Sequence, residues 1–177
     1  MAYRTKTYIA ADWDGDKDAV EQLYKWKNSN YWSLDFHDAH EVQQARDSSL
    51  NCSIKKSLKE RLDISKTFVL IVGNNTKTVR SGSCQYCPSK NSWTGACARG
   101  YMVDNRSYIE YECDKAKEAY NEGKMNIVVL YNASSVDKSK CPETLKYIGT
   151  HEKMKSLNLS TWTYDCDYQA VKKALNQ

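Results

Sequence analysis

The sequence contains no long hydrophobic run. Its N-terminal segment, MAYRTKTYIAADWDGD, has no apolar stretch of the length found in a signal peptide. No later segment approaches the ~20 apolar residues that a membrane-spanning helix needs. We therefore expect a cytoplasmic protein without a membrane partner.

Several ligand-binding signatures are also missing. No GxGxxG motif or P-loop follows a strand-like segment, which disfavours the conventional dinucleotide and nucleoside-triphosphate folds. The 26 basic and 22 acidic residues give a net charge of only +4, and the basic residues are scattered rather than clustered. We therefore expect no nucleic-acid partner. Repeats and low-complexity tracts are absent from the sequence.

Seven cysteines are present, an odd number in a chain without a secretion signal. This favours reduced thiols or a metal site over a disulfide framework. Cys84 and Cys87 form a C-x-x-C pair, and Cys97 follows in the same loop. A strong zinc signal needs four ligands, and here the fourth would be Cys113 or a distant histidine. We therefore favour thiols that brace the loop, with no metal, and keep zinc at Cys84, Cys87 and Cys97 as the minor alternative.

The order of patterns along the chain predicts an α/β fold. A chain of 177 residues, 41% of them apolar, fits a single domain spanning residues 1–177. The expected strands cover residues 5–11, 32–36, 68–72, 126–131 and 157–162, and amphipathic helices alternate with them. The strand at 68–72 is apolar throughout, which is typical of a parallel sheet covered on both faces. We expect ligands at the carboxyl ends of these strands.

Two helices have informative patterns. The second expected helix places Ile54, Leu58 and Leu62 inward and Lys55, Lys56, Lys59 and Glu60 outward. The last expected helix runs from about Asp167 to Leu175. Between residues 74 and 106 lies a long loop with little periodicity, and loops longer than ~15 residues are usually functional or disordered.

The helix after this loop carries the candidate catalytic residue. Ser107 and Glu110 fit the reciprocal capping box, S-x-x-E, so the helix should begin at Ser107. Glu112 then lies at the edge of the apolar stripe of that helix. A carboxylate that faces a core needs a cation, hydrogen-bond donors or a ligand. Pattern alone leaves a paired structural glutamate and a functional one equally open.

Four segments together resemble the TIR-like domains of bacterial Thoeris anti-phage systems. They are YIAADWDGDKD at 8–18, DFHDAHEVQQARDSS at 35–49, KTFVLIVG at 66–73 and YIEYECDKA at 108–116. The resemblance covers most of the chain, and its most specific part is the second segment with the amphipathic helix that follows it. The long cysteine-containing loop is absent from minimal TIR domains.

The resemblance implies a five-stranded, flavodoxin-like parallel sheet with helices on both faces. It also implies NAD⁺ glycohydrolase or ADP-ribosyl cyclase activity, in which NAD⁺ is the substrate and no cofactor is needed. The catalytic glutamate of the family, preceded by an aromatic residue, corresponds to Glu112 after Tyr111, and the resemblance implies that Tyr111 contacts the substrate. The family further implies a homo-oligomer formed through TIR surfaces, and an effector protein reached by a diffusible cyclic ADP-ribose isomer.

Substrate contacts are expected from the loops after the first two strands. The nearest polar candidates there are Asp14, Asp16, Asp38 and Arg46, of which Arg46 is the most natural phosphate partner. Two other functions stay open. One is a nucleoside deoxyribosyltransferase-like enzyme, in which Glu112 would be a covalent nucleophile. The other is a TIR interaction module that assembles without catalysis. The two histidines flanking Asp38, His37 and His40, are expected to cap and hydrogen-bond rather than bind metal.

Overall fold

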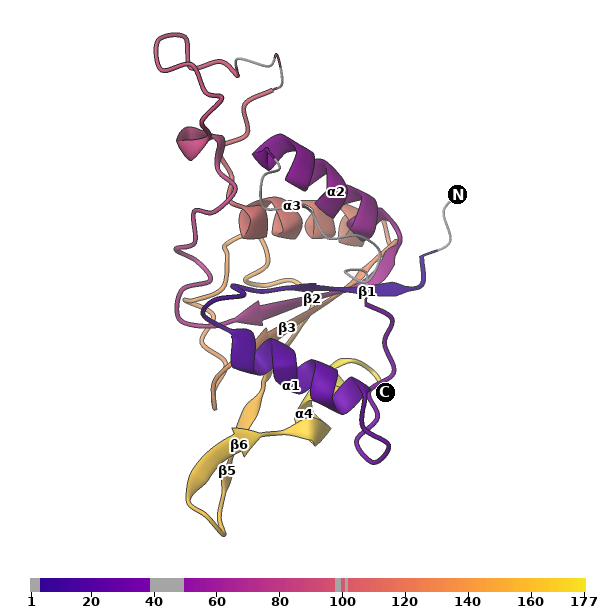
Figure 1. Ribbon diagram of the computed structural model, residues 1–177. Coiled ribbons are helices and arrows are strands. Elements are labelled where there is room, and N and C mark those ends of the chain that lie inside the picture. Colours follow the sequence, from indigo (N-terminus) through magenta and orange to yellow (C-terminus); the bar gives the residue numbers. More distant parts are fainter. Residues whose placement is uncertain (1–3, 39–49, 98–99, 101) are drawn as a thin grey trace.

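The computed structural model describes residues 4–38, 50–97, 100 and 102–177. A parallel sheet of four strands, in the order β1-β2-β3-β4, forms its centre (Figure 1). These strands are β1 (Lys6–Ala10), β2 (Ser65–Val72), β3 (Asn126–Tyr131) and β4 (Thr150–Lys153). A separate antiparallel hairpin consists of β5 (Lys155–Asn158) and β6 (Thr163–Cys166). In the described residues, no helix is both long and apolar enough to span a membrane.

Helices cover both faces of the sheet. The helices α2 (Asn51–Asp63) and α3 (Tyr108–Asn121) lie on one face, and α1 (Lys17–Lys27) and α4 (Tyr168–Ala174) lie on the other (Figure 1). Side chains alternate along each strand, so β1 directs Tyr8 and Ala10 into the α2–α3 core and Ile9 into the α1–α4 core. This double burial explains why β2 is apolar along most of its length.

The predicted strand at 32–36 is wrong. Leu34 and Phe36 are buried, which accounts for the strand-like pattern, but these residues do not join the sheet. The backbone pairs with β1 only slightly later, where the N–H of Thr7 donates to the carbonyl of His37 (2.7 Å) and Thr7 and Asp38 form an isolated parallel bridge. The described sheet is therefore four-stranded and parallel, not five-stranded.

The predicted strand at 157–162 is also wrong as a member of the sheet. The last sheet strand is instead β4, whose sequence, THEK, has no apolar run and whose pairing with β3 depends on backbone hydrogen bonds. Leu157 belongs to the hairpin, where it is 41% exposed. The C-terminal helix is confirmed, because α4 begins after Asp167, whose carboxylate accepts from the N–H of Ala170 (3.0 Å).

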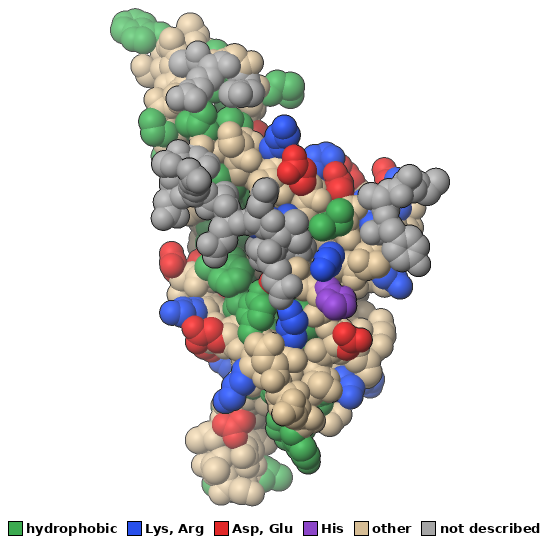
Figure 2. Space-filling model, turned by 45° about the vertical axis from the view of Figure 1, so that its right-hand side comes forward, with side chains coloured by type: hydrophobic (Ala, Val, Ile, Leu, Met, Phe, Trp, Pro, Cys, Tyr) green, Lys and Arg blue, Asp and Glu red, His purple; other side chains and the backbone are tan. Residues whose placement is uncertain are grey.

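The described part of the long loop is closed at its base. The N–H of Cys84 donates to the carbonyl of Asp104 (3.0 Å), and a single 3-10 turn, η2 (Cys84–Tyr86), follows. Gly82 has a φ of 91°, and a Cβ there would lie 2.4 Å from the ring of Tyr108. Away from the base the loop projects into solvent, where Trp93 is 96% exposed, and hydrophobic side chains are visible at the top of Figure 2.

One prediction about α2, the exposure of Lys55, is wrong. Lys55 was expected to face solvent, but it is only 4% exposed. Its ammonium group donates to the carbonyls of Asp104 (3.1 Å) and Arg106 (2.6 Å) and lies 3.4 Å from the Asp104 carboxylate. The neighbouring Lys56, Lys59 and Glu60 are exposed as predicted. Lys55 therefore fastens the end of the long loop to α2.

Candidate functional site

The start of α3 is fixed by the predicted capping box. The hydroxyl of Ser107 accepts from the N–H of Glu110 (3.2 Å), and the Glu110 carboxylate accepts from the N–H of Ser107 (2.7 Å). These two bonds satisfy backbone groups that the first helical turn leaves without partners. Glu110 is thus occupied structurally, and the helix turns Glu112 inward.

Glu112 is buried, with 6% of its surface exposed. The hydroxyl of Tyr8, at the centre of β1, donates to its Oε1 over 2.5 Å. Tyr8 is fully buried and stacks on Phe68 of β2, with ring centroids 5.8 Å apart. The carboxylate is therefore held against the sheet by a residue that is itself immobilised by packing.

Tyr8 stays protonated in this setting. Burial raises the pKa of its hydroxyl well above the ordinary value, and the negative charge of Glu112 and the hydrogen bond to it raise the pKa further. A phenol that does not ionise is a permanent donor. Tyr8 was not predictable from the sequence, because nothing in a single tyrosine of a strand indicates a partner more than 100 residues away.

Arg61 of α2 adds a positive charge close to this pair. Its charge lowers the pKa of Tyr8, although burial outweighs the effect. The side chain is only 7% exposed, and within the described chain its Nε and Nη2 have no hydrogen-bond partner. A buried guanidinium with unpaired N–H groups is costly, and such groups often mark functional positions.

Tyr111 packs beside Glu112 on the same helix and is 8% exposed. Two cations lie near its ring, since Lys55 Nζ is 5.7 Å and Arg106 Cζ is 5.1 Å from the ring centroid. These distances fit cation–π contacts. The structure thus gives Tyr111 a packing role at the base of the long loop, and its predicted contact with substrate stays a prediction.

Asp16 lies where three strands end. It is 2% exposed, and its carboxylate accepts from Asn132, just after β3 (3.0 Å), and from Thr76, after β2 (3.5 Å). Gly73 gives it room, because a Cβ there would lie 2.0 Å from the Asp16 carboxylate. This is the carboxyl edge of the sheet, where α/β proteins bind ligands. Burial raises the pKa of Asp16, while the hydrogen bond from Asn132 opposes that rise.

We expect Asp16→Asn to stabilise the protein at pH 7, by about 0.5–2 kcal/mol, the usual size of a stabilising single substitution. Asp16 has a raised pKa in the folded state. Its stabilising contribution is therefore complete below the unfolded pKa and is lost as the pH rises through the folded value. In urea titrations, the advantage of the variant should grow as the pH rises above the unfolded pKa of about 3.9 and should be complete above the raised folded value. Asp14→Asn, at an exposed position of the same loop, is the matched control. A destabilised Asp16→Asn at pH 7 would contradict this prediction.

The other predicted substrate contacts are dispersed. Asp14 is exposed, whereas Asp38 is 1% exposed and accepts from the hydroxyl of Tyr24 on α1. Asp38 pairs with Thr7 near the start of β1, away from the carboxyl edge where Asp16 lies. Arg46 and His40 lie outside the described residues. Asp38 therefore lies away from Asp16, whereas Asp14 shares the loop after β1 with it but is exposed.

The cysteine loop shows no metal centre in its described part. Cys84 is buried, and Cys87 and Cys97 are half-buried and free. Among the residues that the structure describes, no group of three or more His, Cys, Asp or Glu side chains could hold a metal ion. The minor zinc alternative at Cys84, Cys87 and Cys97 therefore gains no support.

Comparison with known protein families gives a match in the N-terminal part of the chain. Residues 8–81 match the family model described as Thoeris protein ThsB, TIR-like domain. No curated protein matches the chain. The match confirms, over residues 8–81, the predicted resemblance to the TIR-like domains of Thoeris systems. Three of the four resembling segments lie within the matched range, whereas Tyr111 and Glu112 lie beyond it.

Proposed function

We propose that this Thoeris TIR-like protein cleaves the bond between nicotinamide and ribose in NAD⁺ and converts the remainder into a cyclic ADP-ribose isomer. The observation that supports this most directly is the carboxylate of Glu112, buried at the start of α3 and held by the hydroxyl of Tyr8 (2.5 Å). A second is Asp16, a buried carboxylate at the carboxyl edge of the same sheet.

The reaction needs little acid catalysis. Nicotinamide leaves as a neutral molecule from a cationic ring, so no proton has to be supplied to it. The sugar that remains has oxocarbenium character, as in glycoside hydrolysis. A fixed negative charge shielded from water stabilises such a cation more strongly than a solvated one does. Glu112 would provide that charge, and Tyr8 would keep it in position.

The fate of the sugar cation decides the product. Attack by water gives ADP-ribose and releases a proton. Attack by another hydroxyl of the same nucleotide closes a ring, releases the proton of that hydroxyl and gives a cyclic ADP-ribose isomer. The low exposure of Glu112 favours exclusion of water, and hence the cyclic route. The cyclic product would diffuse to the effector of the defence system. No cofactor or metal takes part in this scheme.

The proposal is tested by incubating the purified protein with NAD⁺ and separating nicotinamide, ADP-ribose and cyclic product by chromatography and mass spectrometry. A parallel sample should contain a lysate of phage-infected cells, so that a protein that requires infection for activity is also detected. We expect nicotinamide and cyclic product in equal amounts. The variant Glu112→Gln serves as the inactive control in both samples.

Two outcomes would contradict the proposal and support a different function. A glycosyl adduct on Glu112 after incubation with deoxynucleosides, without NAD⁺ turnover, would indicate the deoxyribosyltransferase-like enzyme. Full anti-phage protection by Glu112→Gln, together with its loss when residues 37–49 are changed, would indicate an interaction module without catalysis.

We expect Tyr8→Phe to lower kcat/KM about tenfold and to move the acidic limb of its pH profile to higher pH. The phenol donates to the charged form of Glu112, and a donor to a carboxylate favours ionisation. A hydrogen bond to a charged group contributes about 1.5–3 kcal/mol, which is consistent with the expected loss. Rates measured between pH 4 and 9 would show the displacement, because the Tyr8 hydroxyl itself does not titrate there.

Tyr131→Phe is the matched control for this substitution. Tyr131 is a buried strand tyrosine in the same core, and its hydroxyl lies 2.9 Å from Nδ1 of His151 instead of a carboxylate. It should lose some stability and leave the pH profile in place. If both variants displaced the acidic limb equally, Tyr8 would have no particular role in holding Glu112.

A further inference from the structure

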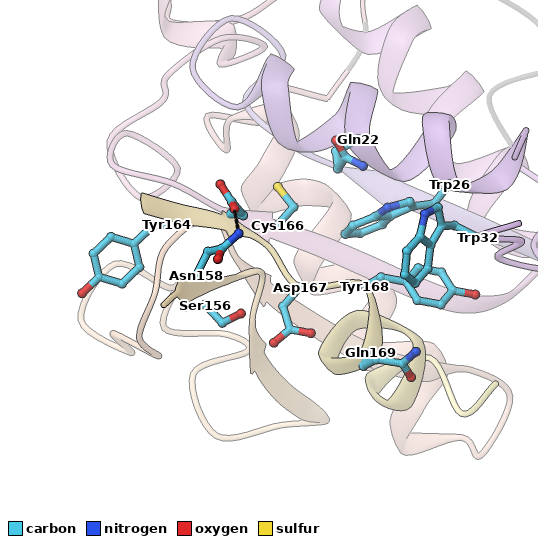
Figure 3. A pocket seen from close by; sticks show the side chains of 11 residues that line it. Gln22, Trp26, Trp32, Ser156, Asn158, Tyr164, Cys166, Asp167, Tyr168 and Gln169 are labelled. Carbon is cyan, nitrogen blue, oxygen red and sulfur yellow. Dashed lines mark hydrogen bonds between the residues drawn. The ribbon is translucent and has the colours of Figure 1, made fainter. Parts of the chain in front are cut away.

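A cavity of about 720 Å³ lies between α1, α4 and the β5–β6 hairpin (Figure 3). Its volume is in the range of about 300–1,000 Å³ that is usual for ligand sites. Trp26 and Tyr168, which line it, belong to the α1–α4 core, whereas the neighbours of Glu112 belong to the α2–α3 core. The cavity is thus on the opposite face of the sheet from the candidate catalytic residue.

An aromatic group forms one end of the cavity. Tyr168 contacts Trp26 and Trp32 edge to face, with ring centroids 5.5 Å and 4.9 Å apart, and its hydroxyl donates to the carbonyl of Ser33 (2.9 Å). Trp26 and Tyr168 are buried, but Trp32 is 42% exposed. The ring of Tyr168 already has the ammonium group of Lys172 at 5.6 Å. Among these three rings, Trp32 is therefore the one whose surface is most available to a ligand.

Two carboxylates line the same cavity. Asp167 uses Oδ1 to cap α4, and Asp165 accepts from Asn158 (2.8 Å) and from Thr163 (3.1 Å). These bonds fix both acids in place. The described lining contains no lysine, arginine or histidine, although the chain as a whole has a net charge of +4. The nearby Lys155 is engaged by Asp18 at 3.3 Å.

Two carboxylates and a described lining without lysine, arginine or histidine favour a positively charged ligand. A phosphorylated nucleotide would meet two carboxylates and no cation among the described lining residues, so the cavity is poorly suited to a second molecule of NAD⁺. The thiol of Cys166 offers no nucleophile, because burial raises its pKa despite the opposing charge of Lys155. An open indole and two fixed carboxylates in one cavity instead match the requirements of an organic cation.

We propose that this cavity binds the guanidinium group of an arginine side chain on a polypeptide partner. A planar guanidinium stacks on an indole and also donates to carboxylates, which an ammonium group does less well. The surroundings favour a polypeptide over a metabolite, because exposed apolar side chains continue from the cavity along the hairpin. Leu157 is 41%, Tyr164 60% and Trp162 76% exposed, and Tyr164 points away from the aromatic group in Figure 3.

The test is a titration of ¹⁵N-labelled full-length protein with a blocked peptide that contains one arginine between apolar residues, followed through the tryptophan indole N–H signals. The same peptide with citrulline in place of arginine keeps the shape and removes the charge. We expect the arginine peptide to move the signal of Trp32, assigned with Trp32→Phe, and the citrulline peptide to bind at least about fivefold more weakly.

Two variants locate the binding. Trp32→Ala should weaken it by roughly three- to thirtyfold, the range of one cation–π contact. Asp167→Asn should weaken it by about two- to fivefold, while an asparagine retains the oxygen that caps α4. Glu60→Gln, which removes one negative charge from an exposed position of α2 on the other face of the sheet, should change nothing.

Three results would overturn the proposal. Equal binding of the arginine and citrulline peptides would exclude charge recognition. Equal binding of the peptide and free arginine amide would exclude a polypeptide partner. A Trp32 signal that does not move would place any binding elsewhere. None of these measurements uses NAD⁺, so the proposal stands or falls independently of the proposed catalytic activity.

Discussion

Glu112→Gln should lower the rate of nicotinamide release by about 10²–10³-fold. The substitution retains an oxygen that accepts from Tyr8 and removes the negative charge that, in the proposed mechanism, stabilises the sugar cation. Loss of one preorganised electrostatic contact in an enzyme typically costs a factor of this size, or about 3–4 kcal/mol of transition-state stabilisation. Single-turnover measurements with the protein in excess over NAD⁺ would report it as a fall in the rate constant of the chemical step.

Glu110→Gln is the control for this prediction. Glu110 lies on the same helical turn, has the same chemistry and is half-exposed in the capping box, which a glutamine also completes. It should keep its activity within about twofold. A change of that size is no larger than the effect expected from one exposed charge pair. Because an amide in place of a buried carboxylate is tolerated, the melting temperature of Glu112→Gln should not fall. Equal loss of activity in the two variants would show that Glu112 acts only through the fold of α3.

Lys55→Met should lower the free energy of unfolding by about 2 kcal/mol. The ammonium group of Lys55 is buried and bonds to two carbonyls at the end of the long loop and to the carboxylate of Asp104. Breaking a buried pair by removing one member usually costs about 3–5 kcal/mol. Arg106 still donates to Asp104 in the variant (2.8 Å), so the cost should be at or below the lower end. Urea denaturation at pH 7 measures it.

The pH dependence of this loss follows from Asp104. Burial alone would raise its pKa, but the hydrogen bonds from Arg106 and the charge of Lys55 outweigh burial and lower the pKa to about 2. The stability due to its charged form is therefore present above the unfolded pKa of about 3.9. It is lost as the pH falls towards 2. The difference between Lys55→Met and wild type should shrink across this interval. Lys56→Met, at the next and exposed position of α2, should match wild type throughout.

Local signals in the sequence were sufficient for the helices. The capping box placed the start of α3 at Ser107 because it depends on residues three apart, and both of its hydrogen bonds are present. Lys55 was misplaced because its burial depends on carbonyls some fifty residues later in the chain. Helical periodicity identifies the polar face of a helix, but it does not predict that a distant loop will cover part of that face.

The strands illustrate a second limit. Buried Leu34 and Phe36 alternate as strand residues do, yet the segment packs without pairing. In contrast, β4 pairs with β3 although its sequence, THEK, carries no apolar signal. Membership of a sheet depends on a partner's backbone, which is not encoded in the segment itself.

The candidate site was predictable only where a local pattern in the sequence identifies the residue. Glu112 could be proposed from its place on a helix and from the resemblance to TIR-like proteins, and the burial expected of it is present. Asp16 was proposed as one of several loop acids, but its contacts with Asn132 and Thr76 come from two later strand ends. Tyr8 and Arg61 could not be found, because their relation to the site exists only after β1, α2 and α3 have packed.

The alternation along β1 makes the spacing of the N-terminal segment as critical as its composition. Tyr8 faces α3 while Ile9 faces α1, so the two sides of the sheet are separated by one position. Deleting a single residue from this strand would rotate every following side chain to the other side. The phenol that meets Glu112 would then be replaced by an aliphatic group. An in-frame deletion of one codon here would therefore impair the protein more than most single substitutions would.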